Sequence, residues 1–353
     1  MRKGRGILIF ALVFTAGDLL GGALTLPPVF YLLSAAAACA SAILLREKVG
    51  DTCTFSVLLL AALLLGAATC QVGRMPPSPP ESAIRAAASR ARADFSLYLG
   101  TILPEGDELA VARALAIGDK GSLTRDLRAV YRESGAMHLL ALSGLHVGII
   151  YGILSLVLSP LGGGRLRRLR VAVILGFLWV FAVISGLSPS ILRAVLMITL
   201  FEISQFFSGQ RNGPAALAFS AVLSILLNPE APRQLSFQLS YSAVTGIYLV
   251  YPRLRLLLST RSRLLGYVWN VACISISCQL TCGVLSYIYF GTFPRYFLVT
   301  NLLAIPLATV VMYALAAALL GAVALPFLRP LLSATLLHSL RLLNHILSII
   351  ASL

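Results

Sequence analysis

The chain has 353 residues, of which 58% are hydrophobic and only 12% are charged, and its formal net charge is +15. A soluble globular domain holds about 25% charged residues, roughly twice this share. The composition therefore excludes an ordinary water-soluble protein and predicts a chain whose main solvent is the lipid bilayer.

Apolar runs without a charged residue recur along the whole chain. They cover residues 7–17, 29–45, 54–73, 136–158, 171–192, 214–229, 234–252, 264–294 and 296–328. Runs of about 18 residues or more are long enough for a helix to cross a bilayer, and most of these runs exceed the ~10-residue strands of a membrane barrel. We predict an all-α polytopic membrane protein, a bundle of roughly nine to eleven transmembrane helices with broken or re-entrant segments.

The N-terminus combines a basic start, MRKGR, with the apolar run 7–17, as a secretory signal does. Asp18 and the residues after it offer no cleavage site of small residues, so we expect a retained first helix with a cytoplasmic N-terminus. Spans that alternate from there place 15 of the 28 cations in cytoplasmic stretches. This is the positive-inside rule, which explains the basic charge without invoking nucleic acid.

The runs predict three parts: N-terminal transmembrane helices over 1–73, an outer segment over 74–135 and a transmembrane domain over 136–353. The outer segment opens with a proline-rich linker, RMPPSPPES, and continues as amphipathic helix over 106–132, broken at Gly118. Its apolar positions are Leu109, Ala112, Leu115, Ala116, Leu123, Leu127 and Val130. The segment is too small and too polar for a core of its own, so we expect it to lie on the membrane surface and cap the bundle.

The stretch HLLALSGLHVG places His138, Ser143, Gly144 and His146 inside an otherwise apolar run. We expect Ser143-Gly144 to form a bend that the two histidines line, next to a pore. Two histidines without a nearby carboxylate make a poor metal site, so we expect no metal and no cofactor. A serine and a histidine three residues apart are neighbours on a helix, which leaves an intramembrane Ser/His hydrolase open as an alternative, although no oxyanion hole is identifiable.

A second break, in GLSPSILRAVLM at 186–197, comes just before Ser190 and Arg193. A charge at mid-membrane costs about 2.5–3.5 kcal/mol, so Arg193 either snorkels to the surface or faces a pore or a phosphate. Glu202 lies nine residues further on, about half a turn around the helix, so the two side chains are not expected to pair.

Polar side chains also recur within other spans, with Gln238 and Ser240 in one and Gln279 in another. They fit either interhelical hydrogen bonds or the wall of a hydrated lumen. The run 296–328 is too long for one span, and we expect Asn301 and Pro306 to divide it into a half-helix and a full span.

Five stretches occur in a recognisable order. They are LAIGDKGSLTRDLRAVYRESG, GAMHLLALSGLHVGI, GLSPSILRAVLM, NPEAPRQLSFQLSYSAVTGIYLVYP and GTFPRYFLVTNLLAIPL. This set resembles the ComEC/Rec2 family of competence proteins, the inner-membrane DNA-uptake channels, over about residues 100–325. Full-length members also have an OB-like outer domain and a C-terminal metallo-β-lactamase-like domain. Here RMPPSPPES stands where the first would be and the sequence ends at Leu353, so we expect both domains and their nuclease activity to be absent.

The resemblance implies a multi-pass channel that passes single-stranded DNA across the bacterial inner membrane during natural transformation, and not an enzyme. It implies the bilayer and single-stranded DNA as partners, an outer DNA-receptor protein, and a cytoplasmic ATPase or helicase, since the sequence has no P-loop motif; a homo-oligomer is also compatible. The expected pore or signature residues are His138, Ser143, Gly144, His146, Ser190, Arg193, Gln238, Ser240, Gln279, Asn301 and Pro306. A small-solute secondary transporter is a further alternative, but its expected inverted repeat is not visible.

Overall fold

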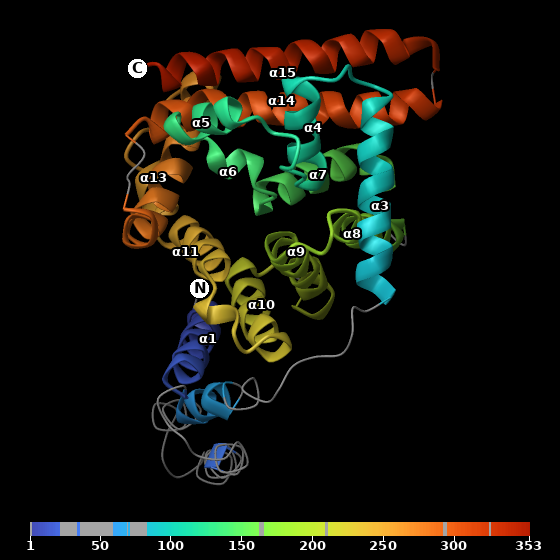
Figure 1. Cartoon of the computed structure of the whole chain (residues 1–353). Coiled ribbons are helices and arrows are strands. Elements are labelled where there is room, and N and C mark those ends of the chain that lie inside the picture. The colour runs from blue at the N-terminus through green and yellow to red at the C-terminus, as the bar shows by residue number, and fades with distance from the viewer. Residues whose placement is uncertain are drawn as a thin grey trace. The chain divides into compact units, whose positions relative to one another are not determined.

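Figure 1 shows the computed structural model of the chain, which describes residues 2–21, 34–35, 59–68, 70, 83–161, 166–208, 211–291, 295–324 and 326–353. Every regular element in these residues is a helix, which confirms the all-α prediction. The chain divides into two units. The first unit is Met1–Pro80 with Leu196–Val244, and the second unit is Glu81–Val195 with Thr245–Leu353.

Several helices build the first unit. They are α1 (Arg2–Gly21), the helix Leu59–Ala68, the C-terminal part of α9 (Pro189–Ser208), α10 (Gly213–Leu227), η2 (Ala231–Arg233) and most of α11 (Leu235–Leu249). α1 packs against α10 and η2, and the buried core between these helices includes Phe14, Ile225 and Phe237. α10 begins where the Asn212 side-chain oxygen accepts a 3.0 Å hydrogen bond from the Ala215 N–H, which satisfies a free donor of the first turn.

Two glycines let α1 and the helix Leu59–Ala68 approach each other closely. A methyl group at Gly17 would lie 2.0 Å from the Leu63 carbonyl oxygen, and one at Gly66 would lie 1.9 Å from the Phe14 carbonyl oxygen. Small residues at helix crossings are the usual means of tight packing where lipid gives no hydrophobic drive. The crossing therefore depends on the absence of a side chain at both positions.

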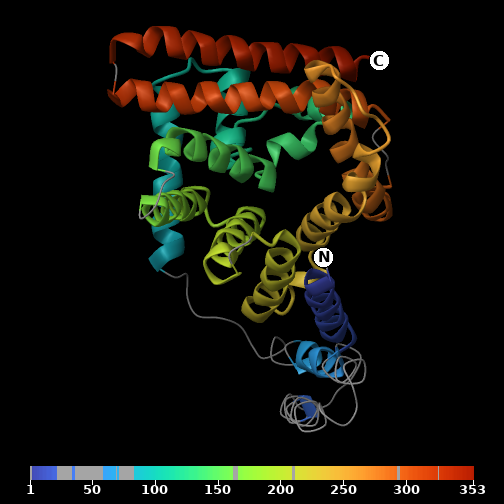
Figure 2. The same cartoon turned by 180° about the vertical axis from the view of Figure 1, so that it is seen from behind.

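The second unit holds the remaining helices. They are α3 (Ala83–Gly100), α4 (Asp107–Ile117), α5 (Arg125–Glu133), α6 (Met137–Leu140), α7 (Gly144–Val157), η1 (Ser159–Leu161), α8 (Leu166–Ile184), the start of α9, α12 (Tyr251–Arg255), α13 (Arg263–Phe290), α14 (Phe297–Ala324), η3 (Pro326–Leu328) and α15 (Arg329–Ala351). α14 and α15 lie side by side, and α4 and α5 pack against α15 (Figures 1 and 2).

Three helices in the described part of the chain are long and apolar enough to cross a membrane. They cover Arg263–Phe290, Phe297–Gly321 and Pro326–Ala351. Shorter apolar helices cover Ala11–Leu20, Leu59–Ala68, Gly144–Val157 and Gly213–Leu227. The chain is thus an all-α membrane protein, and a total of roughly nine to eleven spans stays a prediction.

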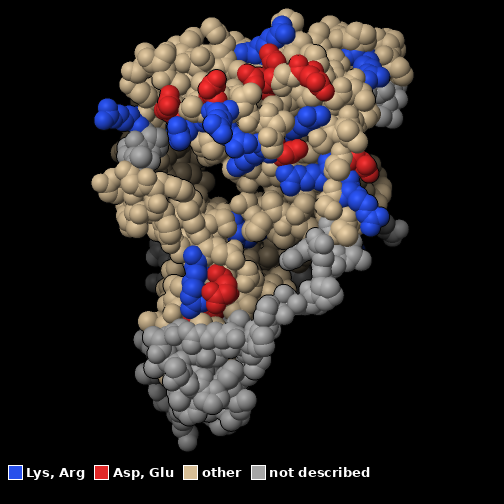
Figure 3. All heavy atoms as spheres, viewed as in Figure 1, with Lys and Arg blue, Asp and Glu red and all other residues tan. Residues whose placement is uncertain are grey.

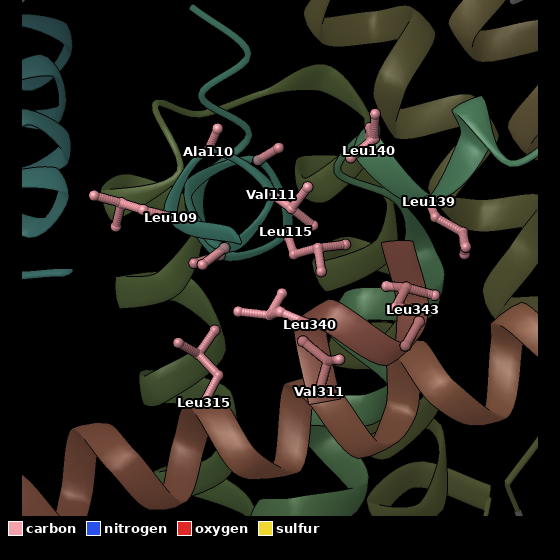
Figure 4. Packing of buried hydrophobic residues seen from close by; sticks show 14 of the residues in the cluster. Leu109, Ala110, Val111, Leu115, Leu139, Leu140, Val311, Leu315, Leu340 and Leu343 are labelled. Atoms are coloured by element: carbon pink, nitrogen blue, oxygen red, sulfur yellow. The ribbon is translucent and has the colours of Figure 1, made fainter. Parts of the chain in front are cut away.

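The outer segment differs from its prediction as a surface cap. α4 is buried on nearly all sides, and its Leu109, Val111 and Leu115 pack with Leu340 and Val311 of α15 and α14 (Figure 4). Of the predicted apolar positions, all are buried except Val130, which packs at the edge of the same core. The segment completes the core of the second unit instead of lying on it, because eight of the eleven residues of α4 are small or apolar and buried.

The predicted break at Gly118 is confirmed. α4 ends at Ile117, and Gly118 adopts a left-handed backbone with φ 69° and donates its N–H to the Ala114 carbonyl. Glycine accepts this conformation without strain. A methyl group there would also lie 2.6 Å from a side-chain carbon of Leu142, so the turn packs tightly against the chain that leads to Ser143.

The predicted division of residues 296–328 into a half-helix and a full span is wrong. α14 runs without interruption through Asn301 and Pro306. Proline removes one backbone hydrogen bond, a loss that a membrane helix tolerates when neighbouring helices hold it in place. α15, α13, α7 and α4 all pack against α14, and Ala304 and Ala308, on either side of Pro306, are buried.

A buried hydrogen bond ties the outer segment to the last helix. The Tyr131 hydroxyl of α5 donates to Asn344 Oδ1 of α15 at 2.9 Å, and Tyr131 is fully buried. Burial raises the pKa of the Tyr131 phenol, so the hydroxyl stays protonated as a donor.

Substitution Tyr131→Phe is expected to lower the free energy of unfolding by about 1.5 kcal/mol, because it leaves the Asn344 oxygen without its donor. Thermal unfolding of the purified protein in detergent measures the change. Tyr98→Phe is the matched control, since Tyr98 is 36% exposed and its substitution should change stability by less than about 0.5 kcal/mol. Equal effects of the two substitutions would contradict the role of this hydrogen bond.

Candidate functional site

The chain bends at Ser143. α6 ends at Leu140, Ala141 is extended, and Ser143 caps α7 with φ −134° and ψ 171°. His146, only 2% exposed, turns back to this cap: its Nδ1 accepts from the Ser143 N–H at 3.4 Å and lies 3.0 Å from Ser143 Oγ. Because a backbone N–H only donates, Nδ1 is an acceptor, so the Ser143 hydroxyl donates to it and the ring proton is on Nε2.

His138 has a different environment. It lies on α6, is exposed, and its Nδ1 lies 3.0 Å from the Gly135 carbonyl oxygen. A carbonyl only accepts, so Nδ1 of His138 carries the ring proton. The two histidines of the motif are therefore in opposite tautomers: His146 closes the start of α7 and His138 fastens α6 to the turn before it.

The turn between α8 and α9 holds an unusual backbone. Gly186 and Leu187 both adopt left-handed conformations, with φ 75° and 55°. For leucine this conformation costs about 1–2 kcal/mol. The Leu187 N–H donates to the Ala182 carbonyl at 2.8 Å, which closes the end of α8, and Pro189 then starts α9.

Arg193 lies on the first turns of α9. Its side chain is 5% exposed, and its Nη2 donates to Ser190 Oγ at 3.2 Å. The next residue, Ala194, faces α7: a methyl group at Gly144 would lie 3.7 Å from the Ala194 side chain. Gly144 at the start of α7 therefore lies close to Ala194 at the start of α9. Ser143 and His146 belong to the first of these helix starts, and Ser190 and Arg193 belong to the second.

Arg92 was not among the predicted site residues. It lies on α3, and its guanidinium Nη1 would be 3.6 Å from a methyl group at Gly186. Arg92 is thus a second cation close to the turn that leads into α9, in addition to Arg193 on α9 itself. The sequence offers Arg85, Arg90 and Arg92 on one helix but gives no sign of which one reaches this turn.

Other predicted residues of the second unit are polar atoms inside apolar helices. Gln279 Nε2 on α13 and Asn301 Oδ1 on α14 are buried and make no hydrogen bond within the described residues. Two serine hydroxyls are also buried without a hydrogen bond within the described residues. They are Ser275 Oγ, one turn before Gln279, and Ser188 Oγ, just before α9. Most buried polar groups in proteins are satisfied, so these atoms are candidates for binding a water molecule or a polar ligand.

Gln238 and Ser240 lie in the first unit. Gln238 Nε2 donates to the Pro232 carbonyl at 2.9 Å, so this amide fastens α11 to η2. The neighbouring Tyr241 hydroxyl lies 3.2 Å from Ser220 Oγ and 3.1 Å from Ser224 Oγ of α10. The Tyr241 contacts join α11 to α10, whereas the Gln238 bond is local to the start of α11. That Gln238 and Ser240 line a hydrated lumen stays a prediction.

Glu202, the acidic residue of α9, has an ion-pair partner in the first unit. Glu202 is 2% exposed and forms a 2.9 Å ion pair with Arg211, whose guanidinium lies over the Phe201 ring. The described residues contain no group of three or more side chains that could hold a metal ion.

The spanning helices and the polar groups buried among them define an α-helical integral membrane protein. A family model described as "Competence protein" matches residues 115–353, more than half of the chain. The chain therefore belongs to the competence protein family, as the resemblance of its motifs predicted.

Curated relatives agree with this assignment. ComE operon protein 3 of Bacillus subtilis is 32% identical over 151 residues, which are 42% of this chain and 19% of that protein. Recombination protein 2 of Haemophilus influenzae is 29% identical over 145 residues, 39% of this chain and 18% of that protein. An uncharacterized protein of Aquifex aeolicus is 32% identical over 143 residues, 40% and 33% of the two chains. The matched region thus covers between about a fifth and a third of these relatives, and no solved structure matches the chain.

Proposed function

We propose that the protein passes single-stranded DNA across the bacterial inner membrane during competence, with its N-terminus in the cytoplasm. Membership of the competence family supports a role in DNA uptake. The observation that carries the finer proposal is the meeting of the starts of α7 and α9, where Gly144 approaches Ala194 beside a buried arginine. Ionisable residues inside membrane segments are costly, and they usually mark a substrate path.

The physical requirement is a path that stays wet. Single-stranded DNA carries one charge per nucleotide, and a phosphate stripped of water without a partner costs many kcal/mol. A channel must replace that hydration with hydroxyls, amides and a few cations, held loosely enough that the strand moves on. Ser143, Ser190, Gln279 and Asn301 supply the first two classes of group.

Cations at the turn into α9 provide the phosphate contacts in this mechanism. Arg193 lies within the first turns and Arg92 lies over Gly186 before them. The N-terminus of a helix also favours anions through its free N–H groups. Bases would stack transiently on exposed tyrosines such as Tyr287 and Tyr289, since stacking tolerates any sequence.

The mechanism needs partners. Arginine contacts hold a phosphate but supply no directed force, so we propose a cytoplasmic ATPase or helicase that pulls the strand. We propose an outer receptor that delivers DNA and a homo-oligomer as one arrangement of the channel.

The test separates capture from passage. In a competent host that lacks the gene, labelled DNA should still be captured at the cell surface, whereas its appearance in the cytoplasm should be lost and restored by the gene. DNA that reaches the cytoplasm at the normal rate without the gene would refute the proposal.

One observation favours a second candidate, an intramembrane hydrolase. Ser143 Oγ and His146 Nδ1 are 3.0 Å apart, within the range of a nucleophile and its base. Against it, His146 makes no hydrogen bond to a carboxylate in the described residues, and the same contact caps α7. Covalent labelling by a fluorophosphonate, lost in the Ser143→Ala variant, would support the hydrolase.

Substitutions of Ser143 distinguish the two roles. If the serine acts as a helix cap, Ser143→Ala should lower the free energy of unfolding by about 1 kcal/mol, whereas Ser143→Asn, also a good cap, should preserve both stability and DNA passage. If Ser143 instead acts as a nucleophile, both substitutions remove it, and both variants should lose the activity that depends on it. Thermal unfolding and DNA passage, measured side by side, give the answer.

A further inference from the structure

The segment 251–265 carries several positive charges and no negative charge. It comprises α12, the turn that follows and the first residues of α13, and we call it the basic segment. It contains Arg253, Arg255, Arg261 and Arg263, and the sequence has no aspartate or glutamate after Glu230. The basic segment thus concentrates four cations in a part of the chain that has no acidic residue.

These arginines are exposed, and none of them forms an ion pair within the described residues. Arg253 donates to the Leu249 carbonyl, and the other three guanidinium groups make no hydrogen bond that the described residues supply. Elsewhere in the second unit, acidic side chains lie among the basic ones on the face in Figure 3, and Arg341 pairs with Glu108 at 3.0 Å.

Large exposed apolar side chains lie beside the arginines in the sequence. Leu256 is 84% exposed, Leu257 74% and Leu264 75%. Leucines this exposed are costly in water and favourable at the boundary of headgroups and acyl chains. The place of the segment fits that boundary, because α13 begins at Arg263 and is one of the three helices able to span the bilayer.

The basic segment is folded onto α13. The Tyr251 hydroxyl donates to Asn270 Oδ1 at 3.3 Å, and α12 packs against α13. Ser262 caps α13 by accepting from the Leu265 N–H at 3.3 Å. The arginines and leucines are therefore presented together at the end of a spanning helix.

We propose that the basic segment binds the headgroup phosphates of anionic phospholipids, with its leucines in the acyl boundary. Clusters of basic residues beside a spanning helix are attracted to anionic lipid. The exposed leucines favour a lipid over single-stranded DNA or an acidic protein, because neither of these offers an acyl phase to receive three aliphatic side chains. The site anchors this end of α13 and does not depend on the DNA path.

The test uses the full chain purified in detergent and fluorescent phosphatidylglycerol in mixed micelles. The wild-type protein should bind phosphatidylglycerol more tightly than phosphatidylcholine, and more weakly as salt rises. The triple variant R255Q/R261Q/R263Q should weaken phosphatidylglycerol binding by about fivefold per arginine, about a hundredfold in all. R255K/R261K/R263K keeps the charge and should bind within about fivefold of wild type.

A matched control removes the same charge elsewhere in the second unit. R125Q/R128Q/R132Q changes three exposed arginines of α5, which have Asp126 and Glu133 beside them, and should leave lipid binding within about twofold. Equal losses in the two glutamine variants, equal binding of the two lipids, or losses as large in the lysine variant would each overturn the proposal. So would displacement of the lipid by a single-stranded oligonucleotide, which would assign the segment to nucleic acid.

Discussion

Arg193→Glu is expected to lower the passage of labelled DNA into the cytoplasm by about a hundredfold, while capture at the cell surface is unchanged. Arg193 is 5% exposed on the first turns of α9, where Ser190 orients its guanidinium. A glutamate there removes the phosphate contact and repels each phosphate that arrives, and a like-charge contact of this kind costs about 3 kcal/mol. At 1.4 kcal/mol per factor of ten, that cost corresponds to about two orders of magnitude in rate.

Arg193→Lys is the matched control, because it keeps the positive charge in a side chain of similar length. It should retain passage within about tenfold, since lysine binds phosphate as a point charge without the planar fork of arginine. Immunoblots of the membrane fraction check that both variants accumulate. Equal losses for the glutamate and lysine variants at equal protein level would remove Arg193 from the phosphate path.

Arg92 allows a second test of the proposed phosphate path. It lies on a different helix and meets the α8–α9 turn through Gly186. If phosphates pass this turn, Arg92→Glu should lower DNA passage in the same direction as Arg193→Glu, and the double variant should lose less than the product of the two effects because the residues serve one turn.

The features that could be predicted from the sequence depend on local composition and on the spacing of nearby residues. Uncharged runs revealed the helical membrane class, because a bilayer demands long apolar segments. The Gly118 break, the bend at Ser143-Gly144 and the break that precedes α9 were also local, since each depends on the backbone preferences of a few adjacent residues.

Contacts between distant residues were not predictable in this way. Tyr131 and Asn344 are 213 positions apart, and Thr300 donates to the Ser134 carbonyl across 166 positions. No periodicity in one sequence pairs such residues. The continuity of α14 through Pro306 has the same cause, because proline breaks an isolated helix and only the surrounding helices decide otherwise.

Burial was misjudged for the outer segment for a related reason. Its charged residues suggested a surface helix, yet α4 carries an alanine-rich and leucine-rich sequence, and eight of its eleven residues are buried in the core that α14 and α15 share. Charges at the ends of α4, such as Glu108 with Arg341, remain at the periphery. A hydrophobic pattern reports which face is apolar, but not how many partners will cover it.

Gly66→Ala is expected to lower the free energy of unfolding of the first unit by about 3 kcal/mol, the upper range for overpacking. The added methyl group would lie 1.9 Å from the Phe14 carbonyl oxygen and 2.7 Å from the Asp18 nitrogen. Both are backbone atoms of α1, so no side chain can rotate away and the two helices must separate. Gly17→Ala meets the Leu63 carbonyl at 2.0 Å and should act in the same way.

Gly176→Ala controls for the substitution itself. Gly176 lies within α8, and a methyl group there has nothing within 4 Å. Alanine is the better helix former, so this variant should be neutral or more stable by up to about 1 kcal/mol. Thermal unfolding of the three variants in the same detergent decides the matter. If Gly66→Ala and Gly17→Ala unfold at the wild-type temperature, α1 and the helix Leu59–Ala68 do not cross through their glycines.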